Sequence, residues 1–356
     1  MRQSFKCICL LAFVMAASPA APLKAAPPPL SAHGQPAGQP DAALARQSRQ
    51  QSERETITVP FSPLLDTPLH FRIIKTEVGA HKPPDRVYDQ ELTYHATAGG
   101  YLLTVKTFSI WVNGQVFYPL DASSGFLPIA DVISLASPIT LRLGPTGRVI
   151  EVNDWDDLRN FIRHLPDRLA GTALVGARGR VRENATTAIQ PIVQVDSVGA
   201  WNFLAAEWPP MLGFGGAQLP LDETLTTSNV HNLFDGAVPV KLNHKVRVTR
   251  RADGGLALDE TQRPNHADFA SAVSQFYDQL ATSTSPKALA ARRAIDADLR
   301  QDLVRTATTH VELDANGAFQ SGYWIVTNQR ADGTMETGER VSFENLGTSP
   351  PARGSN

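Results

Sequence analysis

The chain has 356 residues, a formal net charge of −2, 42% apolar residues and only two cysteines. A chain of this length can bury the core of one or two domains. The small acidic excess argues against a general nucleic-acid binder, which needs an excess of basic residues.

Residues 1–25 are predicted to be an export signal. Arg2 and Lys6 precede an apolar run at 7–17, which is shorter than a membrane-spanning helix. Small residues place the cleavage site after Ala20, with Ala25 as the alternative, and a retained membrane anchor is the other interpretation. The sequence therefore predicts a periplasmic or secreted protein.

Both cysteines, Cys7 and Cys9, lie inside this signal, so the mature chain would have no disulfide, thiol nucleophile or thiolate metal site. No later segment contains ~18 uninterrupted apolar residues, so no transmembrane span is expected in the mature chain. Residues 26–54, rich in Pro, Ala and Gln, are predicted to be a disordered tether, and residues 347–356 a disordered tail.

Residues 55–165 are predicted to form an N-terminal antiparallel β module. Its expected strands are 69–78, a hairpin over 86–112 that turns at Gly99-Gly100, and a second hairpin over 139–152. A helix is expected over 154–166 with Asp154 as its N-cap and Pro166 as its end. Its apolar stripe consists of Trp155, Leu158, Phe161, Ile162 and Leu165.

Residues 166–236 are predicted to be a helical apolar connector. Its most apolar part is 198–221, where Pro209-Pro210 forbids a continuous helix. Two interpretations stay open: a core segment that bridges two β modules, or a flap over an apolar cavity. In the second case the candidate ligand-lining residues are Trp201, Phe203, Trp208, Met211 and Phe214.

Residues 237–346 are predicted to form a C-terminal β module with two helices. Strands over 238–262 turn at 253–255, strands over 309–322 turn at Asn316-Gly317, and strands over 323–343 turn at Asp332-Gly333. The helices are expected over 265–281 and 285–307.

The overall fold class predicted is α+β: two antiparallel β modules with amphipathic helices that cover them. The runs ITLRLGPTGRVIEV (139–152) and THVELDANGAFQSG (309–322) repeat the same hairpin, which suggests internal duplication. The alternative is that antiparallel proteins in general reuse such turns.

Motifs for chemistry are sparse. The nine histidines show no metal-ligand spacing, although His95, His244 and His310 would converge if the two halves faced each other. No G-x-S-x-G elbow and no phosphate-binding glycine loop occurs, so no cofactor, no metal and no catalytic residue is assigned. We lean towards a non-enzyme, with a hydrolase built from scattered residues left open.

The segment TLRLGPTGRVIEV with the Trp-containing helix start after it, and the later AVPVKLNHKVRV, resembles uncharacterised bacterial secreted or periplasmic proteins of unknown function. The resemblance would cover 69–343 and carries over no functional residue. A lipoprotein-carrier half-barrel shares export, antiparallel sheet and helix cover, but no residue here is diagnostic of it.

These observations give three hypotheses of function. The first is a non-enzymatic exported module that binds or carries an apolar ligand, or an envelope accessory protein. The second is a structural or interaction protein without a ligand, and the third is the hydrolase. The expected partners are a hydrophobic small molecule or an envelope protein, and no nucleic acid.

Overall fold

The structure is a computed structural model that describes residues 55–79, 85–118, 127–205, 207–233, 238–272, 304–329 and 335–348. The predicted signal, tether and tail lie outside the described residues, apart from residues 347 and 348. Most of the two helices expected between 265 and 307 also lies outside them.

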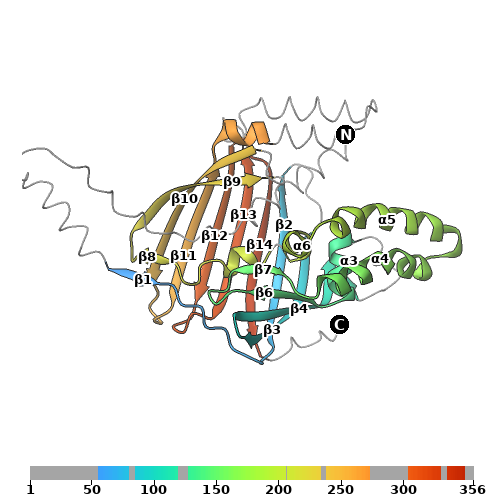
Figure 1. Ribbon diagram of the computed structural model, residues 1–356, viewed down its shortest axis with the longest axis horizontal. Coiled ribbons are helices and arrows are strands. Elements are labelled where there is room, and N and C mark those ends of the chain that lie inside the picture. Colours follow the sequence, from blue (N-terminus) through green and yellow to red (C-terminus); the bar gives the residue numbers. More distant parts are fainter. Residues whose placement is uncertain are drawn as a thin grey trace, which may run out of the picture.

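One antiparallel sheet of 12 strands holds most of the described strands, in the order β7-β6-β4-β3-β2-β14-β13-β12-β11-β10-β9, with β5 paired to β4 (Figure 1). A second sheet pairs β1 (Thr56–Thr58) with β8 (Gln218–Pro220). The strands of the large sheet are β2 (Leu69–Gly79), β3 (Arg86–Thr97), β4 (Gly100–Val112), β5 (Gln115–Phe117), β6 (Ile139–Leu143), β7 (Val149–Val152), β9 (Thr224–Leu233), β10 (Val238–Arg250), β11 (Leu256–Pro264), β12 (Val304–Leu313), β13 (Phe319–Gln329) and β14 (Met335–Gly347). A mixed fold built on antiparallel sheet, as the sequence predicts, is thus confirmed.

The two predicted β modules share this sheet, because β14 pairs with β2. Val341 lies opposite Lys75, and Phe343 lies opposite Ile73. Strands from the two ends of the described chain therefore lie side by side at the middle of the sheet (Figure 1). Duplication of the two halves stays a prediction.

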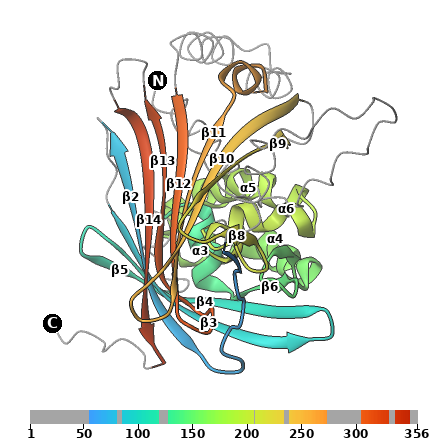
Figure 2. The ribbon, with the colours of Figure 1, turned by 90° about the vertical axis from the view of Figure 1, so that its left-hand side faces the viewer.

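The large sheet has two faces of different character. Along β2, Phe71, Ile73 and Lys75 are buried on one face, while Arg72 and Ile74 point to the other. We call the face of Phe71, Ile73 and Lys75 the inner face. The helical part of the chain lies on one side of the sheet (Figure 2), and three short helices contact the strands: α3 (Ile129–Ala136) contacts β4, α6 (Ser197–Leu204) contacts β7, and α7 (Pro209–Leu212) contacts β12 and β13.

Helix α4 (Trp155–Thr172) is longer than the sequence predicts. Pro166 lies inside it, so the predicted end at Pro166 is wrong. Proline removes one backbone hydrogen bond, but Leu165, Leu169 and Ala170 continue the buried stripe past it and maintain the helix. Asp154 stands at the N-cap position with φ +51°, but its side chain caps no amide.

Helices α4 and α5 (Arg178–Gln194) pack on each other as an antiparallel hairpin. A short 3₁₀ turn, η2 (Val175–Ala177), joins them. Figure 1 shows this hairpin extending sideways, so that the joining turn lies at the end farthest from the sheet.

A second correction concerns the start of β12. The helix expected over 285–307 is wrong at its end, because Val304–Leu313 is a strand paired with β11 and β13. Arg305 and Thr309 are buried and alternate with less buried neighbours, which is the two-residue period of a strand. The rest of that expected helix lies outside the described residues.

The repeated hairpin turn has a structural consequence. Gly147 and Gly317 have φ of +80° and +86°, and each amide bonds back to the third residue before it, Gly144 and Asp314, at 3.0 Å. The hairpin at 251–255 makes the same bonds, so the turn is shared by three hairpins.

Two of these turns meet the same segment, the N-terminal strap (residues 55–66). A Cβ on Gly147 would lie 2.3 Å from the Phe61 ring, and one on Gly317 would lie 2.6 Å from Pro60. The strap also bonds to the connector through Val59, which exchanges two backbone bonds of 2.8 Å with Gly216 and Ala217. At these two tips glycine therefore meets two requirements, the positive φ of the turn and the close approach of the strap.

Within the described residues, no helix is long and apolar enough to cross a bilayer.

Candidate functional site: the inner face of the sheet

The inner face carries an apolar row across nearly its whole width. The residues of this row lie opposite one another on successive strands: Val248, Leu258, Val311, Gly322, Phe343, Ile73, Tyr88 and Ile110. Apart from glycine, these residues are among the most buried in the structure. The row provides an apolar floor for whatever packs on this face.

The next row of the inner face is different, because charged residues enter it. Glu260 lies opposite Thr309 and Lys75 lies opposite Arg86, and the apolar Trp324 and Val341 separate these two pairs. Lys75, Glu260 and Thr309 are between 5 and 7% exposed. Burying a charged side chain costs free energy unless the charge is paired. The partners of these residues therefore indicate which part of the chain packs on this face.

The connector supplies the residues that pack on the apolar floor. The α6–α7 segment (residues 197–214) presents Trp208, which is fully buried. Its indole ring lies 5.4 Å from Phe71, 6.2 Å from Phe319 and 5.0 Å from Phe343, between ring centroids. Aromatic clusters of this edge-to-face type add to the free energy of area burial.

Two polar contacts fix the α6–α7 segment to the sheet. Trp208 Nε1 donates to Gln90 Oε1 at 3.1 Å, and the Gln90 amide donates in turn to Thr107 at 3.1 Å. Beside it, Glu207 Oε2 lies 3.5 Å from Lys75 Nζ, with both side chains 8% exposed. Consecutive connector residues thus make one neutral and one ionic contact with β2 and β3.

Lys75 and Glu207 belong to a larger group, the inner charge cluster, whose members are Lys75, Glu77, Arg86, Tyr88, Asp131, Glu207 and Glu339. Lys75 Nζ lies 4.7 Å from the centre of the Tyr88 ring. The Tyr88 hydroxyl donates to Asp131 Oδ1 at 3.0 Å, and Arg86 donates to Asp131 Oδ2 at 3.1 Å. Asp131 therefore connects helix α3 to strand β3.

The cluster contains four carboxyl groups and two cations, and the pKa of one of these carboxyl groups, that of Glu339, is raised. Burial raises the pKa of Glu339; Lys75 and Arg86 oppose this rise, and the carboxylates of Glu77 and Glu207 add to it. Burial also raises the pKa of Tyr88, which keeps this hydroxyl protonated as a donor to Asp131.

The five predicted ligand-lining residues separate into two groups. Met211 and Phe214 line one apolar cavity with Phe71, Leu313 and Phe319, and Trp208 packs on Phe71 and Phe319 beside it. Trp201 and Phe203 lie on α6, the helix that contacts β7 and α3. The cavity measures about 30 Å³, which is far too small for a lipid-like molecule.

The three histidines that the sequence raised do not converge. His95 pairs with Asp66 at 2.6 Å, His244 with Glu260 at 2.9 Å, and His310 with Asp259 at 2.7 Å. His244 is buried on the inner face, whereas His310 alternates with the buried Thr309 and Val311 and lies on the outer one. Within the described part of the chain, no group of acidic, His or Cys side chains could hold a metal ion.

Sequence reasoning missed the residues that fix the connector to the sheet. Two signals were available. Lys75 follows Phe71 and Ile73 at a spacing of two, so a strand must turn it to the apolar face. Glu207 is the only charged residue between 198 and 221, so its burial with that segment required a cationic partner.

Neither a known protein family, nor a curated protein, nor a solved structure matches the chain. The resemblance to uncharacterised exported proteins therefore stays a prediction.

Proposed function

We propose that this protein is an exported, non-enzymatic carrier for an apolar ligand. In this proposal the α6–α7 segment covers the inner face and occupies the place of the ligand. The ligand displaces Trp208 and Met211 and then contacts the floor of Phe71, Phe319 and Phe343. The export signal and the periplasmic or secreted location are parts of the same proposal.

The observation that carries the proposal is the way the α6–α7 segment is held. It packs an aromatic side chain on an apolar floor and adds one buried ion pair, Glu207 with Lys75. A buried ion pair contributes little stability compared with an apolar pair of similar volume, and its best-attested use is to specify one arrangement among several. A segment that only fills the core needs no such pair.

The segment is also divided into short pieces that can move separately from the sheet. Helix α6 ends at Leu204 and α7 begins at Pro209, and the described residues between them, Ala205, Glu207 and Trp208, are not helical. Helix α6 is held at its start, where Asp196 accepts from the Gly199 amide at 2.7 Å and Ser197 donates to Glu151 at 2.8 Å. Movement about this fixed start would uncover the floor.

Native mass spectrometry of the protein purified from the envelope compartment tests the proposal. A discrete added mass that leaves on denaturation supports a carrier and gives the mass of its ligand. A bare mass, together with no saturable binding of an apolar dye, contradicts it and favours a structural or interaction protein.

A further inference from the structure

The turn between α4 and α5 exposes apolar side chains in a way that needs a separate explanation. Leu174 is 86% exposed and Val175 is 78% exposed, the two highest values among the large apolar residues of the described chain. Single exposed apolar residues are ordinary, but two consecutive ones at the end of an extended hairpin form a compact apolar point. Added Cβ atoms at Gly171, Gly176 and Gly179 would meet nothing within 4 Å, so this turn is open on several sides.

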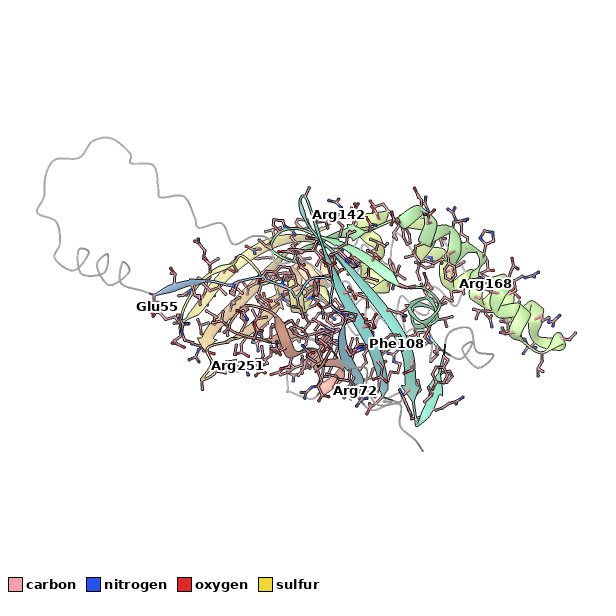
Figure 3. The ribbon with its side chains drawn as sticks, turned by 90° about the horizontal axis from the view of Figure 1, so that it is seen from below. Glu55, Arg72, Phe108, Arg142, Arg168 and Arg251 are labelled. Carbon is pink, nitrogen blue, oxygen red and sulfur yellow. The ribbon has the colours of Figure 1, made fainter. Side chains whose placement is uncertain are left out.

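The same turn is strongly basic. Residues 168–182 contain four arginines, Arg168, Arg178, Arg180 and Arg182, and no acidic residue, in a chain whose net charge is −2. All four arginines are exposed. We call residues 168–182 the basic tip. Arg168 carries a label in Figure 3, on the helical hairpin and away from the sheet.

Only part of this charge is used within the protein. Arg182 Nε lies 2.7 Å from Asp167, and Arg178 Nε donates to the Ala173 carbonyl at 3.3 Å, which holds the turn. The guanidinium of Arg168 lies 5.1 Å from the centre of the Phe161 ring, a contact with an uncharged side chain. The basic tip therefore presents an apolar point surrounded by positive charge.

We infer that the basic tip docks on a bilayer surface that carries anionic phosphate headgroups. Leu174 and Val175 enter the boundary between headgroups and acyl chains, and the arginines bind the phosphates around them. Charge complementarity favours this occupant, because basic residues near an anionic leaflet and apolar residues that enter it reinforce each other. The inference rests on the tip alone and holds whether or not the inner face binds a ligand.

Co-sedimentation with vesicles tests the inference. We expect the purified protein to bind vesicles of phosphatidylglycerol and phosphatidylcholine, and to bind pure phosphatidylcholine vesicles much more weakly, with binding that decreases as salt is raised. The double variant Leu174→Asp/Val175→Asp should lower the partition coefficient by roughly tenfold or more. The variant Arg168→Glu/Arg180→Glu should remove the preference for phosphatidylglycerol.

Matched controls are available elsewhere on the surface. Val230, 66% exposed on β9, serves as Val230→Asp, and the exposed Arg263 on β11 serves as Arg263→Glu. Both controls should bind like the unaltered protein. All variants are identical outside the substituted positions, so differences in binding among them report the tip. Unchanged circular dichroism and melting temperature show that the variants fold.

Equal binding by the tip variants and the controls would overturn the inference. So would absence of binding to phosphatidylglycerol vesicles. If the chain instead forms a dimer that Leu174→Asp/Val175→Asp dissociates, the tip binds a second copy and the membrane assignment is wrong.

Discussion

Two buried polar pairs on the inner face differ in what they connect. Lys75 and Glu207 join strand β2 to a connector residue 132 positions away, whereas His244 and Glu260 join neighbouring strands and are 16 positions apart. The exposed fractions of the four residues are similar, between 3 and 7%. The strand pair joins two strands whose register the backbone bonds already fix. The connector pair joins the sheet to a segment whose described backbone bonds near Glu207 run within the connector itself.

The two pairs represent two kinds of contact: the first kind joins the connector to the sheet, and the second kind joins neighbouring strands. If the connector is a displaceable cover, breaking the first kind should expose the apolar floor while the sheet stays folded. Breaking the second kind should destabilise the sheet as a whole. The first two predictions below compare a residue of one kind with a matched residue of the other, and the later ones compare matched residues within the sheet and its turns.

The largest effect is expected for Trp208→Ala. Removing a fully buried indole should lower the free energy of unfolding by about 3–5 kcal/mol, measured by urea denaturation. Trp324→Ala, on strand β13, should cost a similar amount because Trp324 is 2% exposed. Only Trp208→Ala should also increase saturable binding of an apolar dye. Equal dye binding by the two variants would remove the distinction between connector and sheet.

Breaking the ion pair between Lys75 and Glu207 should lower the free energy of unfolding by a comparable amount. Glu207→Ala leaves Lys75 buried without this carboxylate and should lower the free energy of unfolding by about 3–5 kcal/mol. The double variant Lys75→Met/Glu207→Leu should recover most of that loss, since an apolar pair of similar volume replaces the buried charges. Glu260→Ala is the control: it should be destabilising without increasing dye binding. If the double variant does not recover this stability, the ion pair itself stabilises the folded protein and does more than fix the position of the connector.

A smaller effect is expected at the hairpin turns that meet the strap. Gly317→Ala should lower the free energy of unfolding by about 1–3 kcal/mol. The alanine would have to adopt φ +86°, and its Cβ would approach Pro60. Gly254→Ala is matched, with φ +84° and its nearest new contact, Ala315, at 3.9 Å. The difference between the two variants in thermal denaturation isolates the strap contact. Equal losses would show that the strap contributes nothing at this point.

The smallest effects concern pH, and they should have opposite signs on the two faces. Burial raises the pKa of Glu339 above 4.5, so around and above pH 4.5 this carboxyl group binds more protons in the folded protein than in the unfolded chain. The free energy of unfolding therefore falls as the pH rises from 4.5 through the raised pKa. Glu339→Gln should therefore be more stable than the unaltered protein at pH 7, and equally stable below pH 4.5.

On the outer face the sign reverses. The pKa of Glu312 is lowered, mainly because the Ser321 hydroxyl donates to it; burial opposes this, and Arg251 and His310 add to the lowering. The ionised Glu312 therefore stabilises the folded protein above pH 4.5, and this stabilisation is lost on acidification. Glu312→Gln should be less stable at pH 7, and the difference should vanish in acid. Melting temperatures of both variants between pH 3 and pH 8 check the two signs, and equal signs would contradict the assignment.

Much of the fold was predictable, because period-two alternation and Gly-containing turns define strands locally. The hairpins at 86–112, 139–152 and 238–262 appear where the sequence places them. The union of both halves in one sheet was not predictable, since the pairing of β14 with β2 joins segments more than 250 residues apart and no local pattern specifies it. The end of α4 was missed because the stripe of Leu165 and Leu169 outweighs the break expected at Pro166.

The candidate site was only half predictable. Composition pointed to the Trp-rich connector, and Trp208 and Met211 do lie against the sheet. The partners of the connector, Lys75 and Gln90, depend on which strand faces it, which is a property of the whole sheet. The exposure of Leu174 and Val175 was likewise invisible in the sequence, because it depends on where the α4–α5 hairpin extends.

Hydrogen exchange of the α6–α7 segment tests the central claim most directly, and it needs no ligand. The amides of Ala205, Trp208 and Met211 bond only within that segment, to Trp201, Ala205 and Trp208 respectively. A displaceable cover predicts that these amides exchange through a local opening, faster than the amides of β2 and β3, and faster still in Glu207→Gln but not in Glu260→Gln. Exchange of the same amides only through global unfolding, at the rate of β2 and β3, would contradict the account.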